Sequence, residues 1–293
     1  MAEAPKQRAV LIAGPTASGK SALALRVARE AGGIVINADA MQVYGGLRVL
    51  TARPDVAEMG GIAHRLYGEV PPSQRFSTGE WLRAVREIIA EEGANSLIFV
   101  GGTGLYYQAL LNGFAEVPEI PDSVVREVES ELVGLDREAR AKLIAERDPL
   151  TAAQLREADP QRVVRALAVL RATGRPLASF QGDAQRGLLD GFEVERIVVD
   201  PGREVLRERI ARRFETMFET GAVEEVRALR ALGLDPSLPA MKAIGVPEIA
   251  AWLDGELSRD EAVERAVTAT RQYAKRQRTW LRNRMGDWPR FGG

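Results

Sequence analysis

A glycine-rich loop close to the N-terminus constrains the fold of this chain more than any other feature. The loop reads Gly14-Pro15-Thr16-Ala17-Ser18-Gly19-Lys20-Ser21 and matches the pattern G-x-x-x-x-G-K-[ST]. An apolar run at residues 9–13 precedes it, and a helical pattern over Lys20–Ala31 follows at once. In that setting the backbone N–H groups of the loop and the N-terminus of the helix cradle a di- or triphosphate. Lys20 supplies a positive charge to the phosphate oxygens, and Ser21 offers a hydroxyl ligand to Mg²⁺.

The pattern of strands and helices around this loop predicts the fold class. Three further runs of apolar, β-branched residues predict strands at Ile34–Asn37, 97–100 and 194–199. A helical pattern at residues 80–92 stands between the second and third of the four strands. Strands that alternate with helices in this way are typical of a parallel sheet with helices on both faces. We therefore expect an α/β fold whose core is a P-loop doubly wound parallel sheet.

The middle of the chain differs in character from this core. Residues 119–183 are helical in pattern and almost free of strand signals, with helices expected at 123–132 and 161–172. A strand pattern resumes afterwards, so the economical arrangement is a helical insertion between two strands of one core. The sequence thus predicts a first part of the core at 1–118, a helical insertion domain at 119–183, and a second part with basic C-terminal helices at 184–293.

Composition excludes several classes of site. The 40 Lys+Arg and 41 Asp+Glu residues give a net charge of −1, so the chain as a whole is not basic. The absence of cysteine excludes disulfides, thiolate catalysis and cysteine-based zinc sites, and the single histidine excludes any site that needs several. No apolar run approaches the ~20 residues of a membrane span. We expect a cytoplasmic protein.

A carboxylate at a strand end is the best candidate for a catalytic group. The strand at 97–100 ends in Gly101-Gly102-Thr103 and lacks the aspartate that usually holds Mg²⁺ there, which weakens the interpretation as a plain ATPase. Asp39 instead follows the strand Ile34–Asn37. The C-terminal ends of parallel strands converge on the ligand crevice, so we expect Asp39 to face the bound phosphate and to act as a general base toward an acceptor. A metal-organising role or a helix cap stays open at this point.

A run of positive charge lies near the C-terminus. Residues 271–284 carry six Lys and Arg and no acidic residue, with aromatic residues interleaved. Such a concentration suits a nucleic-acid backbone, whereas a solvated helix face is the alternative.

Taken in order along the chain, these motifs resemble the tRNA dimethylallyltransferases, the isopentenyl-pyrophosphate transferases that prenylate an adenosine beside the anticodon. The cysteine-free chain is most similar to the short bacterial type. The motifs that carry the resemblance are the loop at residues 14–21, Asp39-Ala40-Met41-Gln42-Val43-Tyr44, Thr51-Ala52-Arg53-Pro54, Ala63-His64-Arg65-Leu66, Phe76-Ser77, Gly101-Gly102-Thr103-Gly104-Leu105-Tyr106, Asp159-Pro160-Gln161-Arg162-Val163-Val164-Arg165, Arg213-Phe214 and Thr270-Arg271-Gln272-Tyr273-Ala274-Lys275-Arg276-Gln277.

The resemblance implies transfer of a dimethylallyl group from dimethylallyl diphosphate to N6 of the adenosine at tRNA position 37, with release of diphosphate. The loop would hold the diphosphate together with Mg²⁺ bound through Ser21, and Asp39 would take the proton from N6. Thr16 near the leaving diphosphate, Thr103 where base and donor meet, and Arg213 as a positive clamp complete the implied catalytic set.

The resemblance also implies an RNA partner, the tRNA anticodon stem-loop, over which the insertion domain would close. No membrane is implied, and we expect a monomer. The implied tRNA contacts are Asp39, Ala40, Met41, Gln42, Thr103, Arg126, Gln161, Arg162, Val163, Val164, Arg165, Lys242, Ala243, Ile244, Gly245, Val246 and Pro247.

The sequence departs from the family pattern in two places. Leu50 and Arg53 stand where many relatives have Gly and Lys, and Val246-Pro247 replaces a tyrosine followed by a basic residue. Three other functions stay open: an adenylate prenyltransferase acting on free nucleotides, a P-loop kinase of small molecules, and an RNA-binding module without catalysis. The helical insertion and the basic C-terminus favour tRNA as the acceptor.

Overall fold

The structure is a computed structural model that describes residues 6–93, 95–115, 117–155, 157–180 and 186–292. The chain divides into two compact units, one formed by Met1–Gln108 with Leu189–Gly293 and the other by Ala109–Leu188. The second unit is therefore longer at both ends than the expected 119–183. Gly187 explains the extension, because a side chain there would come within 2.2 Å of the Leu111 carbonyl oxygen. The segment that leaves the unit thus packs directly on the segment that enters it.

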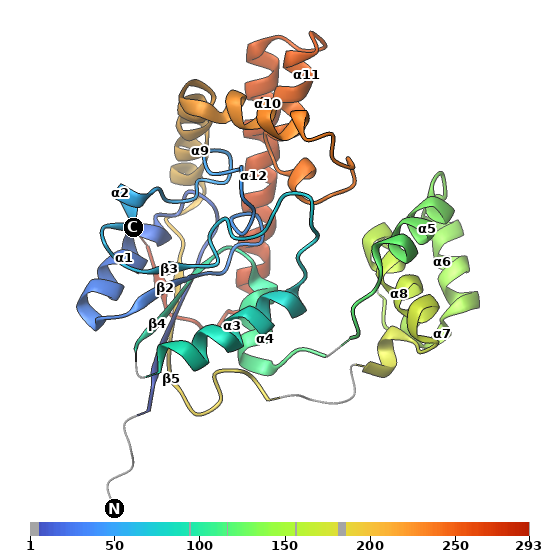
Figure 1. The fold of residues 1–293 in the computed structure, drawn as a ribbon, viewed down its shortest axis with the longest axis horizontal. Coiled ribbons are helices and arrows are strands. Elements are labelled where there is room, and N and C mark those ends of the chain that lie inside the picture. The colour runs from blue at the N-terminus through green and yellow to red at the C-terminus, as the bar shows by residue number, and fades with distance from the viewer. Residues whose placement is uncertain (1–5, 94, 116, 156, 181–185, 293) are drawn as a thin grey trace, which may run out of the picture. The chain divides into compact units, whose positions relative to one another are not determined.

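The first unit is built on a six-stranded parallel sheet (Figure 1). Its strand order is β3-β2-β4-β1-β5-β6, which confirms the expected α/β class. The four expected strands agree with the structure to within one residue at either end, whereas β3 and β6 have two residues each and carry no detectable pattern. The strands are β1 Arg8–Ala13, β2 Ile34–Asn37, β3 His64–Arg65, β4 Leu97–Gly101, β5 Glu193–Val199 and β6 Arg290–Phe291.

Helices cover both faces of the sheet, as alternating side chains along the strands require. Helix α1 (Lys20–Ala31) packs on one face, against Val10 and Ile98. Helices α3 (Thr78–Glu92) and α4 (Gly104–Asn112) lie on the other side (Figure 1). There the α3 residue Trp81 stacks on Tyr106 of α4 with ring centroids 4.1 Å apart. The Trp81 indole N–H also donates to the Asn37 carbonyl oxygen at 2.8 Å, so α3 is held to the end of β2.

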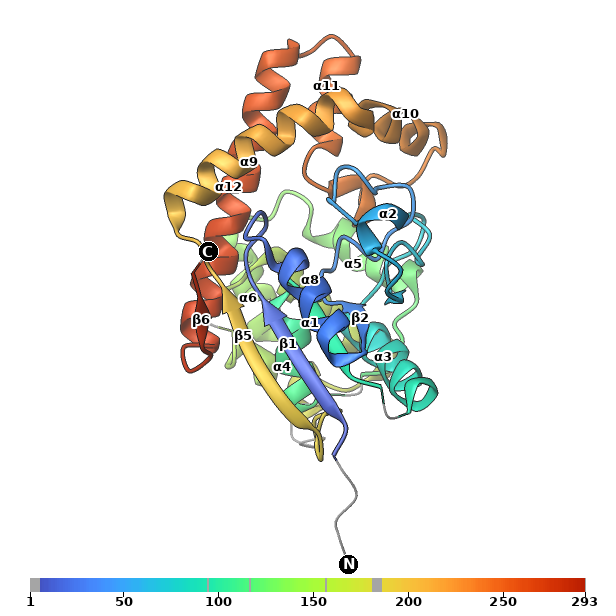
Figure 2. The same ribbon diagram turned by 90° about the vertical axis from the view of Figure 1, so that its left-hand side faces the viewer.

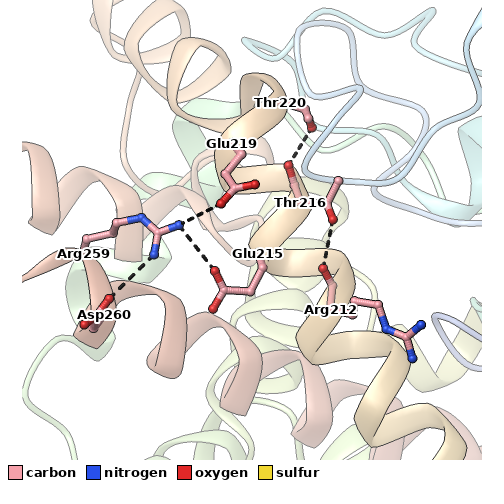
Figure 3. Close-up of polar contacts among 7 residues, drawn as sticks. All are labelled: Arg212, Glu215, Thr216, Glu219, Thr220, Arg259 and Asp260. Carbon is pink, nitrogen blue, oxygen red and sulfur yellow. Dashed lines mark hydrogen bonds and ion pairs between the residues drawn. The ribbon is translucent and has the colours of Figure 1, made fainter.

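A group of helices follows β5 and lies beyond the C-terminal edge of the sheet (Figure 2). The long helix α12 begins at a capping box, in which Ser258 and Glu261 satisfy each other's backbone N–H groups. Near this start, Arg259 contacts Glu215 at 3.4 Å and Glu219 at 3.5 Å (Figure 3). The helices are α9 Arg203–Met217, η2 Phe218–Ala222, α10 Val223–Ala231, η3 Ala240–Lys242, α11 Val246–Leu253 and α12 Arg259–Arg284, with the short α2 Val56–Met59 earlier in the chain.

The second unit is entirely helical within its described residues. Aspartates 136, 148 and 159 cap three of its helices by accepting backbone N–H bonds. The unit has its own apolar core, which contains Val128, Ile144, Val163 and Leu167. Its helices are α5 Asp122–Leu132, α6 Arg137–Arg147, α7 Pro149–Ala152, α8 Pro160–Thr173 and η1 Leu177–Phe180. No helix in the described part of either unit is long and apolar enough to span a membrane.

Candidate active site

The P-loop, residues 14–21, joins β1 to α1 and packs closely against the neighbouring strand ends. The Gly14 N–H donates to the Gly101 carbonyl oxygen at 3.2 Å. A side chain at Gly14 would come within 2.7 Å of the Val199 carbonyl oxygen, so the position requires glycine. Ala17 adopts a positive φ of 63°, which turns the chain toward the first residue of α1. The sequence thus forms the strand–loop–helix arrangement that an anion site of this type needs.

Lys20 lies at the centre of the electrostatics of this loop. Its Nζ donates to the Pro15 carbonyl oxygen at 3.2 Å. The residue as a whole is partly exposed, but its ammonium group lies among protein atoms, and this burial lowers the pKa of Lys20 to about 8. The negative charge of Asp39 raises that pKa and the positive charge of Arg213 lowers it, in that order of size. The structure therefore brings Lys20, Asp39 and Arg213 within electrostatic range of one another.

Asp39 is held at the end of β2 by the buried side chain of Asn37. The Asn37 Oδ1 accepts from the Asp39 N–H, and its Nδ2 donates to the Asp39 carbonyl oxygen, both at 2.9 Å. A second Nδ2 bond reaches the Leu66 carbonyl oxygen at 3.0 Å. The Asp39 Oδ1 in turn accepts from the Met41 N–H at 3.0 Å. The backbone that carries the carboxylate is thus fixed from both sides.

Thr103 joins the end of β4 to the same site. Its Oγ1 accepts from the Ala40 N–H at 2.9 Å, and its own N–H donates to the Ala38 carbonyl oxygen at 3.1 Å. A side chain at Gly101 would lie 2.0 Å from the Ala38 carbonyl atoms, so the strand ends meet with no room for a larger residue. The glycines that stand in place of a metal-binding aspartate therefore serve close packing. They bring the ends of β1, β2 and β4 together.

Four tyrosines surround the Asp39 charge. Burial raises the pKa of Tyr67, Tyr106, Tyr107 and Tyr273, and the charge of Asp39 raises each of them further. These phenols stay protonated near neutral pH and cannot act as bases there. The charge of Asp39 acts on Lys20 and on all four phenols, so this carboxylate lies close to each of them.

Two residues of the site were not found by sequence reasoning. Gln277 of α12 is buried; its Oε1 accepts from the Thr16 N–H at 2.9 Å and its Nε2 donates to the Gly102 carbonyl oxygen at 3.1 Å. Arg209 of α9 reaches the other side of the loop, with an N–H bond of 3.3 Å to the Ser18 carbonyl oxygen. The basic motif around Gln277 pointed to this helix, but nothing in the sequence indicated its contact with a loop 261 residues away.

The residues expected to contact tRNA are spread over both units. In the first unit, Gln42 donates through Nε2 to the Thr51 and Ala52 carbonyl oxygens at 2.8 and 3.0 Å. Lys242 is exposed at the end of η3, and Pro247 is exposed in the first turn of α11. The intervening residues 243, 245 and 246 are buried, so they present little surface to a partner.

In the second unit, the expected tRNA contacts lie on α5 and α8. Arg126 is exposed on α5, and Gln161, Arg162 and Arg165 are exposed on α8. Val163 is fully buried in the core of the unit, so its side chain supports the helix and does not form part of its surface. The exposed residues leave a polar, positively charged face of α8 available to a ligand.

A glycine-rich loop between β1 and α1 and a strand-end carboxylate close to it define the chain as a P-loop α/β protein with an acidic residue beside the loop. Comparison with known families identifies it further. Residues 42–284 match the model of the IPP transferase family, and residues 7–71 match that of the isopentenyl transferases. The chain belongs to the IPP transferase family.

Curated relatives and solved structures agree with this assignment. The chain is 53% identical over 286 residues to the tRNA dimethylallyltransferase of Rhizobium meliloti strain 1021, which covers 97% of this chain and 94% of the relative. It is 54% identical to the tRNA dimethylallyltransferase of Chelativorans sp. strain BNC1, over 96% of this chain and 97% of that one.

Two solved structures share the fold over 98% of this chain. One is a tRNA delta(2)-isopentenylpyrophosphate transferase from Staphylococcus epidermidis, with a TM-score of 0.67, 32% identity and 93% of that chain covered. The other is a eukaryotic dimethylallyltransferase acting on tRNA, with a TM-score of 0.80, 27% identity and 74% of that chain covered.

Proposed function

We propose that this chain transfers a dimethylallyl group from dimethylallyl diphosphate to N6 of the adenosine at position 37 of tRNA. The observation that carries the proposal is that the loop with Lys20, after β1, and the carboxylate of Asp39, after β2, lie at one edge of the sheet, where each charge acts on the other. The Lys20 ammonium can bind a diphosphate, and the Asp39 carboxylate can accept a proton. The two groups lie close enough for each charge to act on the other. Prenyl transfer to an amine needs both groups at once.

The chemistry follows from this placement. The N6 nitrogen attacks the allylic C1 of the donor, and the C1–O bond breaks with its electron pair leaving on the diphosphate. The proton of N6 passes to the Asp39 carboxylate. Lys20 and Arg213, together with the loop N–H groups, stabilise the negative charge that develops on the departing diphosphate. Thr103, whose Oγ1 accepts from the Ala40 N–H, would lie where donor and base meet.

The donor set at the loop is compatible with Mg²⁺. Ser21 exposes its hydroxyl on the first turn of α1, and the buried Ser18 hydroxyl has no hydrogen-bond partner among the described residues. No group of three or more acidic or histidine side chains in the described ranges forms a cage for a metal ion. Mg²⁺ usually takes one or two protein ligands and completes its shell with phosphate and water. Ser21 would hold the ion, which when bound neutralises charge on the diphosphate.

The acceptor is proposed to be the anticodon stem-loop of tRNA. The exposed α8 residues Gln161, Arg162 and Arg165 present hydrogen-bond donors and positive charge, which suit phosphates and unstacked bases. An enzyme that alkylates a ring substituent must first take the base out of its stack, and a loop offers that base at low cost. We place the reaction in the cytoplasm and expect a monomer to carry it out.

One comparison of acceptors tests this proposal against its alternative. With labelled dimethylallyl diphosphate and Mg²⁺, the label should enter unmodified tRNA and should not enter AMP or ATP. A tRNA whose adenosine 37 is replaced by guanosine serves as the matched control and should stay unlabelled. Label in AMP with none in tRNA would establish an adenylate prenyltransferase instead.

A further inference from the structure

A concave, strongly cationic groove lies between α9 and α12, beside the ends of β5 and β6. We call it the α9–α12 groove. Its volume is about 620 Å³, and no residue of the P-loop lines it. Both views show the two helices side by side at this place (Figures 1 and 2). Its cations are Arg203 and Arg207 of α9, Arg271, Lys275, Arg278 and Arg282 of α12, and Arg290 of β6.

The groove holds much more positive than negative charge. Asp200 is its one acidic lining residue, and it is already paired with Arg278 at 3.0 Å. Arg271, Lys275 and Arg282 form no ion pair with any residue of the described ranges. The Nε of Arg271 is moreover buried without a hydrogen-bond partner there. A buried donor that lacks an acceptor indicates that the groove is suited to an acceptor from outside the chain.

Near the start of α12, in contrast, an arginine has several acidic neighbours. There Arg259 is surrounded by Glu215, Glu219 and Asp260 at 3.4, 3.5 and 3.6 Å (Figure 3). Its guanidinium also lies 5.0 Å from the centre of the Phe218 ring. At that end, the chain supplies its own counter-charges. In the groove the balance is incomplete. Arg278 and Arg290 share Asp200, and Arg203 and Arg207 lie 4.0 Å from Glu204, but no acidic side chain of the described residues pairs with the three α12 cations Arg271, Lys275 and Arg282.

The spacing of the α12 cations matches an extended anion. Residues 271, 275, 278 and 282 are separated by four, three and four positions, so they share one face of the helix. At 1.5 Å per residue this row is about 16 Å long, enough for several successive phosphate groups. Like charges at this spacing repel each other, and a row of phosphates relieves the repulsion.

We propose that the α9–α12 groove is a second phosphate site, separate from the P-loop, which binds a row of phosphate groups. The proposal goes beyond prenyl transfer, which uses only the anion site at residues 14–21. The row can come from a free inorganic polyphosphate or from the backbone of an RNA strand. Arginine forks recognise the oxygens of either source in the same way.

Binding should be measured in a Lys20→Ala background, so that the P-loop does not compete for the probes. The test variant adds Lys275→Gln and Arg282→Gln, two exposed side chains whose removal does not disturb the core. The matched control adds Arg26→Gln and Arg227→Gln, which remove the same charge from exposed positions outside the groove. The probes are inorganic tripolyphosphate and a uridine RNA of about ten nucleotides. Circular dichroism first confirms that all three proteins are folded.

Each lost phosphate contact lowers log K by ~0.7 at 0.1 M salt, so the test variant should bind RNA about 25-fold more weakly. Its slope of log K against log salt should fall by ~1.4, whereas the control should keep both values. If the test variant loses affinity for tripolyphosphate alone, the natural source of the phosphates is a free polyphosphate. If it loses affinity for RNA alone, the source is an RNA backbone. Equal affinities in test and control, or no binding of either probe, would overturn the proposal. Pyrophosphate binding is also measured for the two double variants in a chain that keeps Lys20. This measurement reports on the P-loop, so a failure of the groove proposal can be told apart from a failure of the proposed prenyl transfer.

Discussion

The contact between Gln277 and the P-loop gives a prediction whose size follows from the structure. Gln277→Leu keeps the volume of the buried side chain but removes both hydrogen bonds, to the Thr16 N–H and to the Gly102 carbonyl oxygen. A buried polar group left without its partner costs about 1–3 kcal/mol. Thr16 is partly exposed, so water partly replaces that bond, and we expect a total loss of ~2–4 kcal/mol in the free energy of unfolding.

The same substitution should weaken donor binding. If about 1.4 kcal/mol of the loss falls on the loop, the equilibrium constant for its binding conformation falls about tenfold. The apparent Kd for pyrophosphate should then rise by up to about tenfold, with a smaller change in kcat at saturating donor. Gln277→Glu should weaken pyrophosphate binding more than Gln277→Leu does. It keeps the acceptor for the Thr16 N–H, but it places a carboxylate oxygen against the Gly102 carbonyl oxygen, and these two acceptors repel each other.

Two measurements on three proteins check this prediction. Isothermal titration with pyrophosphate gives the Kd, and thermal unfolding gives a Tm that should fall by ~2–4 °C per kcal/mol lost. Gln154→Leu is the matched control, because it makes the same chemical change at an exposed position outside both phosphate sites and should alter neither value. Wild-type pyrophosphate affinity and Tm in Gln277→Leu would refute the idea that α12 organises the loop.

Three further predictions concern the base, the cation and a supporting loop. Asp39→Ala should lower kcat by ~10²–10⁴-fold while pyrophosphate binding changes little; lost binding with high residual turnover would show a metal-organising role instead. Lys20 in the free protein loses its proton as the pH rises through its pKa of about 8. Pyrophosphate affinity should therefore fall by up to about tenfold per pH unit above that value. The Lys20→Gln variant, titrated in parallel, should not show this dependence. Glu225→Gln removes one of the carboxylate acceptors for the Val49 and Leu50 N–H groups, at 2.7 and 3.0 Å, and should cost ~1–2 kcal/mol in denaturant unfolding; an unchanged midpoint would contradict that role.

The sequence was sufficient to predict those parts of the fold that local patterns encode. The strands β1, β2 and β4 are nearly continuous apolar runs, β5 ends in the apolar residues 197–199, and the loop at residues 14–21 carries its own signature. Two-residue strands such as β3 have no period to detect. The edges of the helical unit were missed because Gly187 packs on Leu111, a contact between residues far apart in the chain.

The site shows the same division between local and distant information. Asp39 could be proposed from its place after a strand, whereas the Asn37 side chain that fixes it is recognisable only in three dimensions. The basic run at residues 271–284 was predicted as one surface. In the structure, Arg278 pairs with Asp200 and Gln277 turns toward the P-loop, so the run divides among several roles. Charge counts along a sequence do not show which carboxylates the fold brings near.

Mass spectrometry of nucleosides from modified tRNA tests the central claim most directly. Unmodified tRNA is incubated with the protein, Mg²⁺ and dimethylallyl diphosphate, then digested and analysed beside a reaction with the Asp39→Ala variant. The account predicts N6-dimethylallyladenosine from position 37 with the wild-type protein, and a far smaller amount with Asp39→Ala at equal donor occupancy. Unmodified adenosine at position 37 with folded, donor-bound wild-type protein, or equal yields from both proteins, would contradict it.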